Sequence, residues 1–201
     1  MTISFFKIPE IDKEMDEWIL LVTVTIGYDS MFQNWLYWFQ KLSLNMKLFV
    51  VAEDPLFREK YENNTAFYLI SRDNPFAPDA ENEFGLFYDT PEFNNLTSRR
   101  PHYILNLLRS HSNVIYADID AVWLKDPRPY LTGNYDFWAQ LDGIMEAHEF
   151  SDGYLPYFCT GFLAIRNTTQ SVNLLLEWIK ELESSKVNEG ESTLENNYYP
   201  Y

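Results

Sequence analysis

The chain contains 201 residues, of which 46% are apolar and 17% aromatic, a composition typical of one packed globular domain and unlike that of a disordered chain. Thirty acidic residues against fifteen basic residues give a formal net charge of -15, which repels phosphate groups and argues against nucleic acid or an anionic membrane as a partner. The single cysteine, Cys159, excludes an internal disulfide and a cysteine-based zinc site.

The sequence shows no targeting or membrane-spanning pattern. Residues 1–17 are too acidic and too poor in apolar side chains for a signal peptide. The longest apolar run, residues 18–26, is far shorter than the roughly 20 residues that a transmembrane helix needs. We therefore expect no transmembrane segment in this sequence.

The N-terminal third alternates between strand and helix patterns. Residues 19–26 form an apolar run with threonines, bounded by Gly27, which is typical of a strand buried in a parallel sheet. Asp29 or Ser30 can cap the helix that follows. Apolar residues recur there at helical spacing: Met31, Phe32, Trp35, Leu36, Trp38, Phe39 and Leu42.

The next elements complete a βαβαβ order. Residues 47–54 are predicted to form a strand, residues 55–63 a short helix opened by Pro55, and residues 65–70 a third strand. Such an order requires right-handed crossovers. The predicted fold class is therefore α/β, a doubly wound, mostly parallel sheet with helices on both faces.

Residues 71–96 interrupt the alternation with three prolines and an acidic cluster, and are predicted to form a long loop or insertion that serves as a lid or binding loop. A helix capped at Thr97 or Ser98 follows, with Tyr103, Ile104, Leu107 and Leu108 inward.

The remaining sequence adds three strands and a final helix. The strands are predicted at 113–127, 135–141 and 157–167. The helix is capped at Thr168 or Thr169, and its core face consists of Val172, Leu175, Leu176 and Ile179. Polar residues from 186 onward are expected to fray.

Two aspartates follow the apolar run that begins at Asn113. If the strand continues, Asp118 and Asp120 point to one face at its carboxyl end, where ligands of open α/β sheets bind. Adjacent carboxylates repel each other unless a divalent cation lies between them, and oxygen ligands select Mg²⁺, Mn²⁺ or Ca²⁺. The alternative is a pair of solvated aspartates that close a turn.

Three stretches carry a resemblance to a known family. RRPHYILNLLRSHSNVIYADIDAVWLKDP, from Arg99 to Pro127, resembles the helix, strand and DxD segment of nucleotide-diphospho-sugar transferases of glycosyltransferase family 77, the plant arabinosyl, xylosyl and galactosyl type. TVTIGYDSMFQNWLYWF is similar to the family's first strand and helix, and YFCTGFLAIRNT to its C-T-G-F strand. The resemblance covers most of the chain and implies a GT-A-like, Rossmann-like fold.

The resemblance also implies an activity and a site. It implies a retaining, Mn²⁺-dependent (or Mg²⁺-dependent) transfer of a sugar from a UDP-sugar to a hydroxyl of a glycan or glycoprotein. Asp118 would contact the ribose and the metal, Asp120 would ligate the metal, and Arg100 could reach the diphosphate. The other implied contacts are the nucleotide for Thr23, Thr25, Gly27 and Tyr28, the donor-sugar hydroxyls for Asp142, and the acceptor for Cys159, Thr160 and Gly161. For each of these contacts the alternative is a structural role, in which strand propensity, turn chemistry or ordinary packing explains the residue.

The sequence departs from the family pattern in two ways. GT-A enzymes draw a third metal ligand and much of the acceptor site from later segments, so we expect residues 1–201 to be a single, C-terminally incomplete transferase domain. The resemblance implies the Golgi lumen, but this sequence has no anchor, so a cytoplasmic or truncated form stays open.

Two other functions remain open. D-I-D-A-V also fits the aspartyl-phosphatase pattern D-x-D-x-[TV], with Asp118 as nucleophile and Asp120 as acid and base, although that chemistry needs a downstream lysine and acidic pair. A non-catalytic module that binds nucleotide-sugars is the third possibility.

Overall fold

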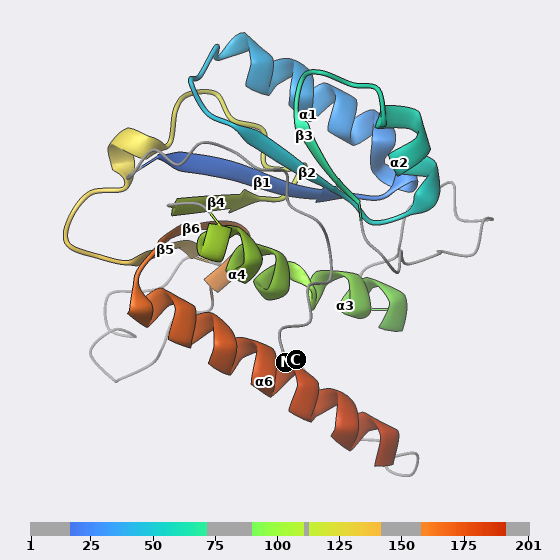
Figure 1. The fold of residues 1–201 in the computed structure, drawn as a ribbon, viewed down its shortest axis with the longest axis vertical. Coiled ribbons are helices and arrows are strands. Elements are labelled where there is room, and N and C mark those ends of the chain that lie inside the picture. Colours follow the sequence, from blue (N-terminus) through green and yellow to red (C-terminus); the bar gives the residue numbers. More distant parts are fainter. Residues whose placement is uncertain (1–16, 72–89, 111–112, 142–157, 192–201) are drawn as a thin grey trace.

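The structure is a computed structural model that describes residues 17–71, 90–110, 113–141 and 158–191, the last seven of these by their backbone alone (Figure 1). These residues contain one six-stranded sheet in the order β3-β2-β1-β4-β6-β5. The strands are β1 (Trp18–Val24), β2 (Leu48–Ala52), β3 (Tyr68–Ser71), β4 (Asn113–Ala117), β5 (Phe137–Leu141) and β6 (Phe158–Arg166). β1 to β4 pair in parallel, and β6 is antiparallel to both β4 and β5. The predicted mostly parallel sheet is confirmed.

Helices cover both faces of this sheet, as predicted (Figure 1). One face packs against α1 (Asp29–Lys41) and α2 (Pro55–Tyr61), and the other against α4 (Arg100–Ser110) and α6 (Thr169–Glu191). A shorter helix, α3 (Pro91–Thr97), precedes α4, and 3-10 turns occupy Ile26–Tyr28 and Arg128–Tyr130.

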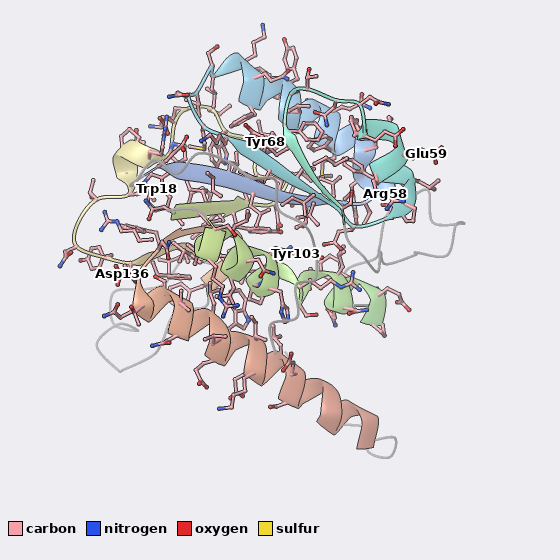
Figure 2. All side chains as sticks on the ribbon, viewed as in Figure 1. Trp18, Arg58, Glu59, Tyr68, Tyr103 and Asp136 are labelled. Carbon is pink, nitrogen blue, oxygen red and sulfur yellow. The ribbon has the colours of Figure 1, made fainter. Side chains whose placement is uncertain are left out.

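β1 explains why the apolar run of the first strand is continuous. Alternate side chains of a strand point to opposite faces. Leu20 and Val22 join the core under α1 and α2, whereas Ile19 and Leu21 join the core under α4 and α6. Because helices cover both faces, each position along the strand must be apolar. Figure 2 shows the side chains between these layers, with Tyr103 of α4 among them.

α1 buries a narrower stripe than the sequence predicted. Its buried residues are Phe32, Trp35 and Phe39, whereas Met31 and Trp38 are 40% and 43% exposed. At about 100° per residue, these two positions lie off the stripe that faces the sheet. Leu176 of α6 is exposed for the same reason, although Leu175 and Ile179 are buried as predicted.

The predicted caps of α1 are also wrong. Asp29 is the first residue of the helix and Ser30 the second, so neither is its N-cap. The Asp29 carboxylate instead accepts hydrogen bonds from Lys60 Nζ at 2.6 Å and Tyr61 Oη at 2.7 Å. It therefore joins α1 to α2, since both donors come from the end of α2.

Two other predictions need correction. Residues 91–97 form α3, not part of a loop, because Thr90 Oγ1 caps the helix through Phe93 N and Pro91 occupies its first position. β4 ends at Ala117, so the strand predicted over 113–127 stops before both aspartates. α6 also continues to Glu191, past the predicted start of fraying at 186.

Within the described ranges, none of the helices combines the length and the hydropathy that crossing a membrane requires.

Candidate active site

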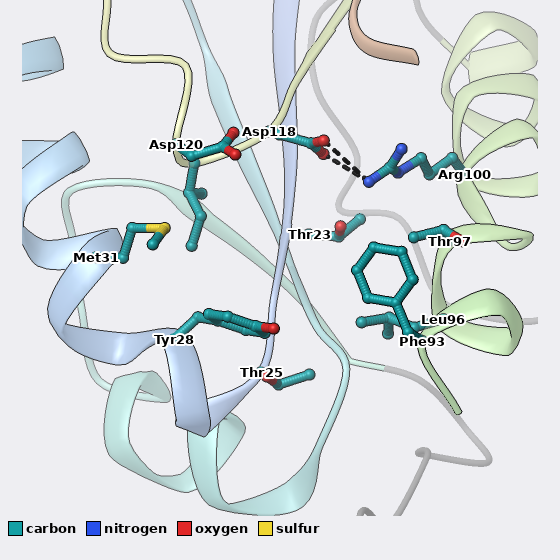
Figure 3. A pocket seen from close by; sticks show the side chains of 11 residues that line it. Thr23, Thr25, Tyr28, Met31, Phe93, Leu96, Thr97, Arg100, Asp118 and Asp120 are labelled. Atoms are coloured by element: carbon teal, nitrogen blue, oxygen red, sulfur yellow. Dashed lines mark hydrogen bonds and ion pairs between the residues drawn. The ribbon is translucent and has the colours of Figure 1, made fainter. Parts of the chain in front are cut away.

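A pocket opens at the carboxyl ends of β1 and β4, which are adjacent parallel strands. Leu21 of β1 lies opposite Tyr116 of β4, so Thr23 and Asp118 follow at the same edge of the sheet. The pocket has a volume of about 180 Å³ and is partly closed by α3 and the start of α4 (Figure 3). Its lining residues are Thr23, Thr25, Tyr28, Met31, Phe93, Leu96, Thr97, Arg100, Asp118, Ile119 and Asp120.

Asp118 forms an ion pair with Arg100 on the wall of the pocket. Arg100 Nη2 lies 2.9 Å from Asp118 Oδ1 and 3.0 Å from Oδ2, and Arg100 Nη1 donates to Thr160 Oγ1 at 2.8 Å. Figure 3 shows the Arg100 side chain reaching from α4 toward the carboxylate. The ion pair joins α4 to the turn after β4, and β6 supports the arginine from behind.

Tyr116 supplies the other contact to Asp118. Its hydroxyl donates to Asp118 Oδ1 at 2.7 Å and lies 3.2 Å from Thr23 Oγ1. The Arg100 guanidinium carbon also lies 5.3 Å from the centre of the Tyr116 ring, a cation–π distance. Tyr116 is therefore in contact with both members of the ion pair.

Burial dominates the protonation equilibria here. It raises the pKa of Asp118 above the ordinary 3.8, because it outweighs Arg100 and Tyr116, which favour the anion; the charge of Asp120 adds to the rise. Burial also raises the pKa of Tyr116 well above its usual range. The phenol of Tyr116 is thus neutral at physiological pH, and it acts as a hydrogen-bond donor to the carboxylate.

Gly161 of β6 allows this arrangement to be compact. Its carbonyl accepts a hydrogen bond from Asp118 N at 2.8 Å. A Cβ added at Gly161 would lie 3.0 Å from Asp118 Oδ2 and 3.4 Å from Cys159 Sγ. Any side chain at this position would therefore crowd the carboxylate.

Asp120 differs from Asp118 in its surroundings. The two lie on a turn, in which Ala121 N donates to Asp118 O and Val122 N to Asp120 O. Asp120 is exposed and lines the pocket, and the described residues give its carboxylate no hydrogen bond or ion pair. Figure 3 shows both carboxylates above the same pocket.

The two carboxylates fit a hard divalent cation by their donor type, and Asp120 is the accessible one. Asp118 has contacts to Arg100 and Tyr116 and would have to share its oxygens. Among residues 17–71, 90–110, 113–141 and 158–191, no three acidic, histidine or cysteine side chains come together as a metal site.

The structure brings together most of the predicted site residues. Thr23, Thr25, Tyr28, Arg100, Asp118 and Asp120 all line the pocket. Gly27 lies in the adjoining 3-10 turn and does not line it. Thr160 and Gly161 lie behind Arg100 and Asp118, with the half-buried Cys159 beside them on β6. Asp142 lies outside the described residues.

Six residues of the site were not predicted from the sequence, one of them Ile119, which lies between the two aspartates. Tyr116 was missed, although a strand residue two positions before Asp118 shares its face. Phe93, Leu96 and Thr97 come from α3, which the Thr90-Pro91 pair, a cap followed by proline, could have indicated. Met31 reaches the pocket because it lies off the buried stripe of α1.

A buried aspartate holds Tyr28 at the pocket. Asp54 is 1% exposed, and its Oδ1 accepts a hydrogen bond from Phe57 N at 2.8 Å, which caps α2. Its Oδ2 accepts from Ile26 N at 2.6 Å. The same carboxylate thus fixes the start of α2 and the Ile26–Tyr28 turn that carries Tyr28 to the pocket.

Solved structures show the same fold. The galactosyltransferase LgtC, in complex with donor and acceptor sugar analogs, aligns with a TM-score of 0.52 and 15% identity over 82% of this chain and 65% of its own. The apo structure of the bifunctional glycosyltransferase WbbM aligns with a TM-score of 0.51 and 14% identity over 86% of this chain and 35% of its own. At these identities the likeness concerns the fold, and it confirms the expected GT-A-like architecture.

Sequence relatives point the same way. UDP-D-xylose:L-fucose alpha-1,3-D-xylosyltransferase 3 of Arabidopsis thaliana is 29% identical over 181 residues, 86% of this chain and 46% of the relative. UDP-D-xylose:L-fucose alpha-1,3-D-xylosyltransferase MGP4 of the same plant is 29% identical over 178 residues, 83% of this chain and 47% of the relative. The chain spans about half the length of these curated relatives. The sequence model of the nucleotide-diphospho-sugar transferase family matches residues 44–197, so the chain belongs to that family.

Proposed function

We propose that the protein is a glycosyltransferase that moves a sugar from a UDP-sugar to a hydroxyl of a glycan or glycoprotein. One observation carries the proposal: in a chain of this family, Asp118 and Asp120 lie on the wall of a pocket at the carboxyl ends of two adjacent parallel strands. Ligands of open α/β sheets bind at such edges. The xylosyltransferase relatives support the same class of reaction.

The lining residues suit the parts of a nucleotide-sugar. The Tyr28 ring offers a face on which a base can stack, and Thr25 offers a hydroxyl just after β1. A diphosphate would meet a chain of net charge -15, and Arg100 is the cationic side chain among the pocket's lining residues. We assign the diphosphate to the side of the pocket formed by Arg100 and the two aspartates.

Asp118 and Asp120 would hold the divalent cation, Mn²⁺ or Mg²⁺. When bound, such a cation stabilises the charge of the departing diphosphate as a Lewis acid. The chain's own contribution is to pair one carboxylate, Asp118, with Arg100 while the other remains accessible. This division keeps two anions side by side on one pocket wall.

The relatives suggest the first substrates to test. Their names specify UDP-D-xylose as donor and L-fucose as acceptor, so we propose UDP-xylose as the first donor and a fucosylated glycan as the first acceptor. The Golgi lumen, expected from the family resemblance, is proposed as the compartment, and imaging of the tagged full-length protein tests it.

A thermal-shift titration tests the donor site. UDP with Mn²⁺ should raise the melting temperature, by an amount equivalent to about 2.7 kcal/mol at a ligand concentration of one hundred times Kd. Asp120→Asn should abolish the shift, because it removes the accessible carboxylate. Glu177→Gln, which changes the same charge on the exposed face of α6, should leave the shift intact. Equal shifts in both variants would contradict the proposal.

A non-catalytic nucleotide-sugar-binding module is the second candidate. Tyr28, Arg100 and Asp118 line the pocket, an observation that bears on binding of a nucleotide-sugar and not on its turnover. A UDP-dependent thermal shift without hydrolysis or transfer across a panel of UDP-sugars would support it. No contact in the described structure favours the aspartyl-phosphatase reaction over these two.

A further inference from the structure

Tyr116 is an enclosed polar residue beside the site that the function proposed above leaves without a role. It lies on β4, is 1% exposed and does not line the pocket. Its neutral phenol carries one hydrogen, and the 2.7 Å contact places that hydrogen on Asp118 Oδ1. Tyr116 can therefore influence a bound ligand only through its neighbours.

The donor in the hydrogen bond between Thr23 and Tyr116 follows from the position of the phenolic hydrogen. Thr23 Oγ1 lies 3.2 Å from the phenolic oxygen, and geometry alone permits either group to donate. Because the phenol gives its hydrogen to Asp118, Thr23 must be the donor to Tyr116. The Thr23 hydroxyl thus donates a hydrogen bond to the Tyr116 phenol, and the phenol donates one to the Asp118 carboxylate.

The ring of Tyr116 makes a separate contact. The Arg100 guanidinium carbon lies 5.3 Å from the ring centre, while Arg100 Nη2 contacts both oxygens of Asp118. The hydroxyl and the ring can be tested apart, since Tyr116→Phe removes the hydroxyl and keeps the ring beneath the arginine.

We propose that Tyr116 is a positioning residue, with Thr23 behind it, that fixes the Asp118 carboxylate in the orientation needed to hold the cation to which the diphosphate binds. The inference rests on the proposed donor site. A carboxylate oriented before binding loses less rotational freedom when a ligand arrives. The hydrogen bond from Tyr116 should therefore increase the affinity for UDP in the presence of the cation. Thr23 then acts through Tyr116, in place of the direct nucleotide contact that the family resemblance implies.

The chain offers a matched control for the hydroxyl. Tyr61 Oη donates to Asp29 Oδ1 at the same distance, 2.7 Å, at the junction of α1 and α2. Tyr116→Phe and Tyr61→Phe each remove one phenol that donates to a carboxylate, and both should lower the melting temperature modestly. Tyr116→Phe alone should weaken the affinity for UDP in the presence of Mn²⁺, by about tenfold, as measured by isothermal titration calorimetry.

A double-mutant cycle separates Thr23 from the ligand. Thr23→Val preserves the shape of the side chain and removes its hydroxyl. If Thr23 acts through Tyr116, it should weaken UDP binding in the wild-type background and have no further effect in the Tyr116→Phe background. Additive losses would show that Thr23 touches the ligand directly and would overturn its part of the inference.

A crystal structure of unliganded Tyr116→Phe provides a test that does not depend on binding. The Asp118 carboxylate should leave its position in this variant and keep it in Tyr61→Phe. An unmoved carboxylate, or an affinity within twofold of the wild-type value, would overturn the inference. If the wild-type protein fails to bind UDP with Mn²⁺, the proposed function fails, and the position of Asp118 in the variant alone decides whether Tyr116 positions it.

Discussion

Asp118 and Asp120 belong to one motif but occupy different surroundings. The side chain of Asp118 is 28% exposed and contacts Arg100 and Tyr116, whereas Asp120 is exposed on the turn that follows. The pair is therefore asymmetric before any ligand binds. One carboxylate contributes a fixed orientation and the other contributes accessibility, a difference that the three letters DxD do not contain.

Gly161 is the position at which a single methyl group tests this orientation. Gly161→Ala would place a Cβ 3.0 Å from Asp118 Oδ2, tighter than an ordinary contact, so the carboxylate must move by a few tenths of an ångström. We expect a modest loss of stability, about 1 kcal/mol, and a several-fold weaker affinity for UDP with Mn²⁺. Urea unfolding and calorimetry measure the two effects. An unchanged affinity together with an unmoved Asp118 in a crystal structure would contradict the expectation.

The sequence predicted which residues lie at the pocket better than it predicted which of them contact each other. Asp118, Asp120, Arg100 and Thr23 were predicted near a ligand, and all of them line the pocket. The pairing of Arg100 with Asp118 joins residues 18 positions apart, through a helix start and a strand end whose relative placement depends on the whole sheet. Such distances are set by tertiary packing, so no local pattern could supply them.

At the scale of elements, polar junctions decide where helices meet the sheet. Asp54 fixes α2 and the turn that bears Tyr28, and Asp29 joins α1 to α2 through Lys60 and Tyr61. Both carboxylates lie at helix starts, where the partial positive charge of the backbone favours an anion. These junctions hold one side of the pocket in place.

The Asp29 junction predicts a pH dependence. Burial raises the pKa of Asp29, but the hydrogen bonds from Lys60 and Tyr61 outweigh it, and the net pKa lies below the ordinary 3.8. The unfolded chain therefore binds the proton first as the pH falls, so the stabilisation is present above pH 3.8 and is lost below it, through the lowered pKa of the folded state. The same contact, with burial as the larger cause, raises the pKa of Tyr61 to about 12.

Asp29→Asn should remove this part of the acid dependence. At neutral pH the variant should be less stable by about 1 kcal/mol, because hydrogen bonds to a charged group are replaced by weaker ones. At pH 2 the difference from the wild type should shrink. Urea unfolding at the two pH values measures it, and a difference that stays constant with pH would contradict the assignment.

Element order was predictable where the hydrophobic period was clear. The βαβαβ start follows from continuous apolar runs in the strands and period 3.6 in α1, and it is confirmed. α3 was not predicted because proline is a frequent breaker of regular structure, whereas Pro91 opens a helix behind the cap Thr90. β4 was predicted too long because its apolar pattern continues into Ile119, which is buried on the turn beyond the strand.

At the scale of the whole molecule, the sheet collects side chains that are distant in sequence. Thr23, Arg100, Asp118 and Thr160 come from β1, α4, the end of β4 and β6, and they meet because parallel β1 and β4 are neighbours and β6 lies beside β4. The parallel order places the carboxyl ends of β1 and β4 at one edge of the sheet. The helices on each face exclude water from the buried side chains beneath that edge, such as Tyr116. The chain as a whole is strongly acidic, so binding of a diphosphate requires local positive charge at this edge.

The most direct test of the donor site is a crystal structure of the protein with UDP and Mn²⁺. We predict nucleotide density in the pocket between Tyr28 and Arg100, with a metal ion in contact with Asp120. Nucleotide bound elsewhere, or a pocket that stays free of nucleotide at saturating UDP and Mn²⁺, would contradict a donor site at this pocket.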